Sequence, residues 1–182
     1  MTPTNWGRML VADARAQRLT ERCAEHSIDV LWVREKNMAS PALEELLRNT
    51  VLQVRIAVIA SVSAAIAQRV GVHGVHLADN SERASGVVAA RQSGLAVGGS
   101  AHALAGVAAL RDLGVDWIVF GPVRATPKGG VLLPGCGFDA LRAAAHAAGP
   151  VPLIAIGGLG PQDTAMLRAC GASGLAGIRC FG

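Results

Sequence analysis

The sequence predicts an α/β protein, a compact (β/α)8 TIM barrel in which the eighth helix is missing. Eight short apolar runs alternate with Ala- and Leu-rich helical segments along the 182 residues, which implies parallel strands joined by right-handed crossovers. Aromatic residues make up only 3% of the chain, and this suits small-residue helices packed on buried strands. Because such barrels usually need about 200 residues or more, an open doubly wound sheet is the alternative.

Each element follows from its apolar pattern and from the residues that flank it. The predicted strands are 8–13, 29–35, 55–60, 74–77, 95–100, 116–121, 152–158 and 174–179. The predicted helices are 14–26, 40–50, 62–71, 81–93, 102–113, 137–148 and 161–170. Ser40 before Pro41 is typical of a helix N-cap, and Gly114, Gly149 and Gly171 stand where a helix ends in a left-handed glycine. The chain reaches Gly182 directly after the last strand, so we expect no eighth helix.

Composition limits the classes of function. The net charge is +4, and the basic residues are spread out without interleaved aromatic residues, which disfavours nucleic-acid binding and favours a small anionic ligand. The four cysteines have neither CxxC spacing nor a histidine cluster, so we expect free thiols in a reducing compartment. We see no signal-peptide pattern and no apolar run of membrane-spanning length. We therefore expect a single cytoplasmic domain over residues 1–182, without a membrane partner.

Polar residues at the carboxyl ends of the predicted strands are the candidate site, because active sites of such barrels lie there. Alternation places Arg34 and Lys36 on one face of the second strand, where they point into the mouth or into solvent. His76 and His102 end the fourth and fifth strands. Either histidine is a candidate general base, and the alternatives are a structural His76 in the barrel wall and a His102 in the first turn of a helix.

Two glycine-bearing loops are candidates for anion binding. The stretch FGPVRATPKGG, residues 120–130, follows the sixth strand and contains Thr126 and Lys128. Gly157 and Gly158 follow the seventh strand, just before a predicted helix. Glycines let backbone N–H groups approach a phosphate, and a helix N-terminus adds positive charge. The loops after strands seven and eight are the usual phosphate site of this fold.

These strand ends, taken in order, resemble the thiamin-phosphate synthase/TenI family over nearly the whole chain. WVREK is similar to the family's QLREK, GVHL matches outright, and GGSAH is similar to GVSAH. GPVRATPK is similar to GPVFPTxTK, AIGGL to AIGGI, and GASGLAGIR to the final GAxGVAVIS strand. The ending GLAGIRCFG is nearest to the synthase-like domains that are found fused to Nudix hydrolases.

The resemblance implies a (β/α)8 barrel and a set of binding residues. The synthases join a pyrimidine pyrophosphate to a thiazole phosphate with Mg²⁺ on the leaving group. The residues implied for the pyrimidine and pyrophosphate side are Arg34, Lys36, Ser100, Thr126 and Lys128. The residues implied for the thiazole phosphate are Gly157, Gly158, Ile178 and Arg179.

Departures from the family pattern bear on the reaction. The two magnesium-binding Asp positions of the synthases hold Val62 and Ser81, with Ser61 beside the first, and Trp32 replaces the Gln that contacts the pyrimidine. Asp79 is the remaining carboxylate that could bind Mg²⁺. TenI proteins are thiazole tautomerases that need no metal, but their acid/base His corresponds to Pro122.

Three hypotheses follow from these matches and departures. The first is a TenI-like protein that binds a thiazole phosphate without a cofactor, as a tautomerase with His102 or His76 as the base. The second is a divergent synthase with Mg²⁺ on Asp79. The third is a non-catalytic binding or regulatory module. In each case the partner is a small phosphorylated heterocycle, and the uncovered barrel surface left by the missing helix favours a homodimer.

Overall fold

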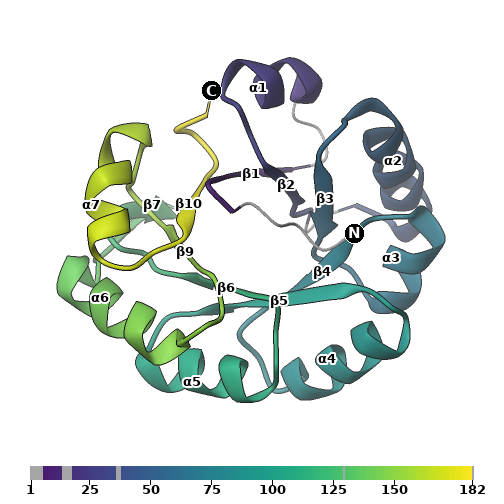
Figure 1. Ribbon diagram of the computed structural model, residues 1–182. Coiled ribbons are helices and arrows are strands. Elements are labelled where there is room, and N and C mark those ends of the chain that lie inside the picture. The colour runs from purple at the N-terminus through teal and green to yellow at the C-terminus, as the bar shows by residue number, and fades with distance from the viewer. Residues whose placement is uncertain (1–5, 14–17, 36–37, 129, 182) are drawn as a thin grey trace.

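A computed structural model describes residues 6–13, 18–35, 38–128 and 130–181, and it contains a closed parallel barrel (Figure 1). The strand order around the barrel is β1-β10-β9-β6-β5-β4-β3-β2. The barrel strands are β1 (Arg8–Ala12), β2 (Val30–Val33), β3 (Ala57–Ala60), β4 (Gly74–Leu77), β5 (Ala96–Ala101), β6 (Trp117–Phe120), β9 (Leu153–Ile156) and β10 (Gly174–Gly177). Every neighbouring pair is parallel, which confirms the predicted TIM barrel over the open sheet.

Seven α-helices surround the barrel within the described part of the chain (Figure 1). They are α1 (Leu19–Glu25), α2 (Ser40–Gln53), α3 (Ala64–Val70), α4 (Arg83–Gln92), α5 (Leu104–Asp112), α6 (Gly137–Ala148) and α7 (Thr164–Ala169). Gly114, Gly149 and Gly171 follow α5, α6 and α7 with φ of 71°, 60° and 85°, so these predicted helix ends are confirmed. The predicted N-cap is one residue off, because Ala39 is the cap and Ser40 already begins α2.

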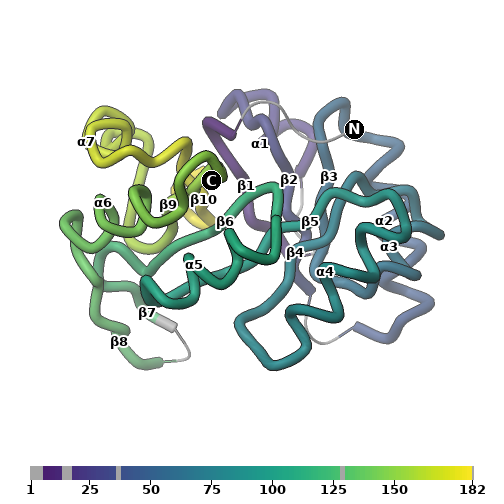
Figure 2. The backbone as a smooth tube through the Cα atoms, turned by 60° about the horizontal axis from the view of Figure 1, so that its bottom comes forward, coloured from purple at the N-terminus to yellow at the C-terminus, as the bar shows by residue number. Residues whose placement is uncertain are grey.

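Three parts of the predicted element list were wrong in detail. The loop after β6 contains an antiparallel hairpin, β7 (Thr126–Lys128) and β8 (Val131–Leu133), which projects at the lower left of Figure 2. The strand predicted over 152–158 ends at Ile156, because Gly157 and Gly158 adopt positive φ. The helix predicted over 161–170 divides into a 3-10 turn, η1 (Pro161–Asp163), and α7.

The last described residues fold back against α1 (Figure 1). Arg22 donates from Nε to the carbonyl oxygen of Phe181 (3.2 Å) and from Nη2 to that of Ile178 (3.3 Å). The Phe181 side chain is fully buried in the layer between strands and helices. This turn covers part of the barrel surface that the missing eighth helix leaves open. We expected that surface to form a homodimer, and the homodimer stays a prediction. No helix among the described residues combines the length and the apolar character of a membrane span.

The barrel interior is filled mainly by large side chains from alternate strand positions. Its buried members are Trp6, Met9, Val11, Val30, Trp32, Ile59, Ala96, Trp117, Val119, Ile154 and Ala176. The rings of Trp6 and Trp117 lie 5.0 Å apart between their centroids. The Trp117 indole covers Gly98 so closely that a Cβ added there would overlap the ring. Small residues on β5 therefore make the space that the tryptophan occupies.

Replacing Gly98 by alanine should destabilise the barrel by about 3 kcal/mol, because neither the strand backbone nor the packed indole can move aside. Urea denaturation measures this loss. The matched control is Gly106→Ala in α5, where an added Cβ meets its nearest neighbour, the Ala101 Cβ, at 3.4 Å. That change should be neutral or stabilise the protein by up to about 1 kcal/mol through helix propensity. Equal stabilities of the two variants would contradict the packing described.

Candidate functional site

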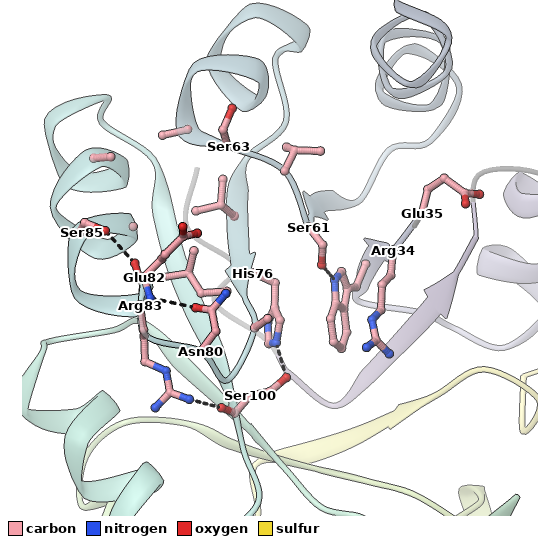
Figure 3. A pocket seen from close by; sticks show the side chains of 18 residues that line it. Arg34, Glu35, Ser61, Ser63, His76, Asn80, Glu82, Arg83, Ser85 and Ser100 are labelled. Carbon is pink, nitrogen blue, oxygen red and sulfur yellow. Dashed lines mark hydrogen bonds between the residues drawn. The ribbon is translucent and has the colours of Figure 1, made fainter. Parts of the chain in front are cut away.

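A cavity of about 790 Å³ opens between the carboxyl ends of β2, β3 and β4 and the beginnings of α3 and α4 (Figure 3). Its polar and charged lining consists of Trp32, Arg34, Glu35, Ser61, Ser63, His76, Asn80, Glu82, Arg83, Ser85 and Ser100. Three of the predicted site residues, Arg34, His76 and Ser100, therefore share one cavity. The cavity lies at the strand ends where barrels of this class carry their sites.

A chain of hydrogen bonds links the barrel interior to this cavity. Trp117 Nε1 donates to His76 Nδ1 (3.0 Å), and His76 Nε2 lies 2.9 Å from Ser100 Oγ. An indole N–H can only donate, so Nδ1 must be the unprotonated nitrogen of a neutral His76. Nε2 then carries the hydrogen and donates it to the serine.

His76 is held in this neutral state by its surroundings. Burial and, to a smaller extent, the positive charge of Arg34 together lower its pKa to about 3. The imidazole is 3% exposed, and the Trp32 ring lies against it with 3.9 Å between centroids. Both ring nitrogens are engaged, so His76 has no lone pair for a substrate proton. Of the two predicted alternatives for His76, these contacts support the structural one.

Trp32 connects the cavity to β3 and to Arg34. Its Nε1 donates to Ser61 Oγ (2.9 Å), and the guanidinium carbon of Arg34 lies 5.7 Å from the centre of its ring. The predicted direction of Arg34 into the mouth is consistent with its place in the cavity lining. The sequence indicated neither the role of Ser61 nor that of Trp117, since only the fold brings β3 and β6 to these partners.

Arg83 is a further cation of the cavity that sequence reasoning missed. It is the first residue of α4 and only 8% exposed. Its Nη2 pairs with Asp79 and also donates to the carbonyl oxygen of Ser100 (3.0 Å), while its buried Nε has no hydrogen-bond partner. Asp79, the candidate magnesium ligand, is thus engaged with a guanidinium. No cluster of three or more metal-binding side chains occurs among the residues that the structure describes.

His102 lies just beyond the end of β5 and is exposed. Its Nδ1 hydrogen-bonds to the carbonyl oxygen of Gly121, which follows β6. A carbonyl oxygen can only accept, so Nδ1 carries a hydrogen, and in the neutral imidazole Nε2 is the nitrogen with the lone pair. His102 precedes α5, which begins at Leu104, rather than forming its first turn. It stands outside the lining of the cavity.

The loops after β6 and β9 form one packed unit. Val123 N donates to the Ile156 carbonyl oxygen (2.9 Å) and Arg124 N to that of Gly157 (3.0 Å). The Arg124 guanidinium binds the buried Asp163 carboxylate at 2.8 Å. A Cβ on Gly157 would lie 2.5 Å from that of Pro122, so this close contact requires glycine at position 157.

The predicted phosphate residues lie in the loops after β9 and β10, apart from the cavity lining. Gly158 is exposed after β9, and Ile178 and Arg179 are exposed after β10. At the start of η1, the Gly160 N–H is already bonded to the Asp163 carboxylate (2.9 Å). A phosphate here would therefore depend on the glycine backbone before Gly160.

The remaining predicted binding residues follow β2 and β6. Thr126 begins β7 and its hydroxyl donates to the Arg124 carbonyl oxygen (3.3 Å). The backbone of Lys128 ends β7, but its side chain is outside the described atoms, and Lys36 lies outside the described residues altogether. The binding roles of all three stay predictions.

Comparison with known proteins gives a consistent family match. A family model described as thiamine monophosphate synthase matches residues 7–181. A thiamine biosynthesis bifunctional protein ThiM/ThiE of Symbiobacterium thermophilum is 30% identical over 176 residues, which are 93% of this chain and 36% of that protein. A putative thiamine-phosphate synthase of Geobacter sulfurreducens is 34% identical over 61% of this chain and 52% of its own length. The chain thus spans about a third to a half of the curated relatives it matches.

Solved structures show the same fold at lower identity. A thiamine phosphate pyrophosphorylase from Pyrococcus furiosus aligns with a TM-score of 0.77 and 21% identity over 94% of this chain and 85% of its own. FabK from Thermotoga maritima aligns with a TM-score of 0.76 and 14% identity, over 97% of this chain and 59% of its own. At these identities the likeness supports the barrel architecture alone.

Acidification should destabilise the protein through His76. Its pKa is 6.5 in an unfolded chain and about 3 here, so between these values the unfolded state binds more protons. Stability is therefore complete above pH ~6.5 and falls as pH drops through this window, by about 2 kcal/mol between pH 7 and pH 5. Urea denaturation at both values should show this slope in wild type and in His146→Asn, an exposed control in α6. His76→Gln should lack that share of the slope, and an unchanged slope would refute the neutral buried state.

Proposed function

Because this chain belongs to the thiamin-phosphate synthase family, which includes TenI, we propose that it is a TenI-like protein that binds a thiazole phosphate and acts as a thiazole tautomerase. The observation that carries the proposal is the hydrogen bond between His102 and the carbonyl oxygen of Gly121. It brings an imidazole beside Pro122. In TenI proteins, the position that corresponds to Pro122 holds the acid/base histidine. His102, from the neighbouring strand, takes over that place.

The arrangement of strands supports one ligand across the mouth. β6 stands between β5, which carries His102, and β9, which leads into Gly157 and Gly158. Two strand spacings are roughly 10 Å, which a phosphorylated single-ring heterocycle can span. The phosphate then lies at the glycine loop, and the ring lies near the imidazole and the cavity.

The chemistry asked of His102 is a proton transfer. Nδ1 holds its hydrogen against the Gly121 carbonyl oxygen, which fixes the tautomer and leaves the Nε2 lone pair as a base. The base takes a proton from a ring carbon, the electron pair of that bond shifts into the conjugated ring, and the imidazolium returns the proton to another ring position. Substrate and product have the same atoms and charge, so no co-reactant is needed.

Removing His102 should abolish most of the tautomerisation. His102→Asn should lower kcat by roughly 10²- to 10⁴-fold, the usual contribution of a positioned general base. NMR of a carboxythiazole phosphate incubated with purified protein measures the conversion. His146→Asn, on the outer face of α6, should retain full activity. Binding of the thiazole phosphate without turnover, even at high protein concentration, would replace the tautomerase by the non-catalytic binding module.

The divergent synthase is the second candidate, and the donor set at the cavity disfavours it. Mg²⁺ prefers one or two carboxylates with water, whereas Ser61, Val62 and Ser81 occupy the family's positions and Asp79 is paired with Arg83. We therefore propose a reaction that needs no metal, and we derive no step through one.

Metal removal separates the two candidates. We expect tautomerisation to be unchanged by EDTA, because no residue assigned to it binds a cation. We expect no thiamin phosphate when pyrimidine pyrophosphate, thiazole phosphate and Mg²⁺ are supplied together. Magnesium-dependent formation of thiamin phosphate, or rescue of a synthase-deficient strain, would establish the synthase instead.

A further inference from the structure

The segment that follows β6, residues 121–124, is hydrogen-bonded to both parts of the proposed site. At its start, the Gly121 carbonyl oxygen accepts the bond from His102 Nδ1. At its end, the Arg124 N–H donates to the carbonyl oxygen of Gly157 (3.0 Å) in the loop after β9, which is the neighbour of β6 in the barrel (Figure 1). The segment is therefore the structural link between the imidazole and the glycine loop.

The Arg124 side chain ties this segment to the far end of the glycine loop, residues 157–160. Its Nη2 lies 2.8 Å and its Nη1 3.2 Å from the two carboxylate oxygens of Asp163, the last residue of η1. The Asp163 side chain is 8% exposed, and it also accepts the Gly160 N–H (2.9 Å). The loop is thus bonded at Gly157 to the backbone of Arg124 and at Gly160 to the partner of its side chain.

We propose that Arg124 and Asp163 are a positioning pair that holds the glycine loop in the conformation that receives the phosphate. Neither side chain touches the ligand in this role, because the pair acts through the backbone of Gly157 and Gly160. A bidentate guanidinium–carboxylate contact suits the role, since two parallel hydrogen bonds fix an angle as well as a distance. The proposal rests on the proposed function, because it names the residues that organise the phosphate end of that site.

The glycine loop needs a restraint from outside. Gly157 and Gly158 have φ of 99° and 65°, which glycine adopts readily, but glycine also has more backbone freedom to lose than any other residue. A loop that spends only part of its time in the competent conformation binds its ligand more weakly by that fraction. The contacts of Arg124 and Asp163 reduce this freedom before any ligand arrives.

Two single substitutions separate positioning from a direct effect of charge. Asp163→Asn removes a negative charge beside the loop and Arg124→Gln removes a positive one, so an electrostatic effect on a bound phosphate has opposite signs in the two variants. Loss of positioning weakens binding in both. The KM for the carboxythiazole phosphate, and the Kd for inorganic phosphate from calorimetry, should each rise by roughly 3- to 30-fold in both variants, the range for residues that act without contacting a ligand.

The turnover number should stay within about twofold of wild type in both variants, because only binding is lost. The Val123 N–H still donates to the Ile156 carbonyl oxygen (2.9 Å), and this bond holds the part of the segment next to His102 without help from the ion pair. An unchanged KM in both variants, or changes of opposite sign, would overturn the proposal. The second of these results would make the pair a source of charge rather than of position.

Asp116→Asn is the matched control. Asp116 precedes β6, at the opposite end of the barrel, and has the same kinds of partner: it accepts the Val97 N–H (2.7 Å) and pairs with Arg91 at 3.0 Å. This variant removes an equivalent ion pair, so its KM and Kd should equal those of wild type. A rise equal to that of Asp163→Asn would reduce the role of Asp163 to general stability and would overturn the proposal.

Two further measurements keep the test decisive if a single variant does not fold. Arg124→Gln combined with Asp163→Asn leaves the net charge unchanged and no unpaired partner, and it should raise KM as the single substitutions do. ¹⁵N relaxation of the unmodified protein without ligand should show the Gly157 and Gly158 amides to be as ordered as the barrel strands, with order parameters of about 0.85. A mobile loop in the native protein would overturn the proposal.

The two proposals can fail separately. Binding of inorganic phosphate that depends on Arg124 and Asp163, without conversion of the carboxythiazole phosphate, would reject the tautomerase and retain the positioning pair. Tautomerisation with a KM that neither substitution changes would do the reverse. Failure of both probes to bind wild type would reject both.

Discussion

The hydrogen bond from Trp117 Nε1 to His76 Nδ1 is the interaction on which the interior and the cavity both depend. It satisfies two buried polar groups that would each cost free energy if left unpaired. It also requires room for an indole inside a narrow barrel, which Gly98 provides on the neighbouring strand. The same bond fixes the tautomer of His76 and, through it, the direction in which Ser100 presents its hydroxyl. The packing of Trp117 inside the barrel therefore determines the tautomer of His76 and the hydrogen bond that Ser100 receives at the mouth.

The barrel and several of its helix ends could be predicted because local sequence patterns indicate them. Alternation along β2 correctly put Trp32 and Arg34 on one face, and the glycines after α5, α6 and α7 marked the helix ends. The rest depends on contacts between distant segments. Arg83 comes to Ser100, and Trp32 comes to Ser61, only after the barrel closes. The hairpin β7–β8 was missed because its two strands are three residues each and β7 contains Pro127.

The mouth of the barrel contains two separate environments, and the family comparison alone does not distinguish them. On one side, the loops after β6 and β9 are locked together by the Arg124–Asp163 ion pair and by glycines that allow close backbone contact. On the other side, β2, β3 and β4 surround a cavity with fixed donors and cations. His102 stands between them through its bond to Gly121. A ligand with a phosphate at one end and a ring at the other matches this division.

At the ends of β3 and β4, this chain has uncharged residues where the synthase pattern has carboxylates, so the cavity is less negatively charged. The side-chain contacts of the cavity agree with this change in charge. A site with acidic side chains needs a cation before it can accept a phosphate or carboxylate, because like charges repel at short range. Here the Ser61 hydroxyl, which accepts the Trp32 indole N–H, carries no charge, and the Arg83 guanidinium already pairs with Asp79, the nearby carboxylate. The departures from the synthase pattern are therefore consistent with one another and with the metal-free reaction that we propose.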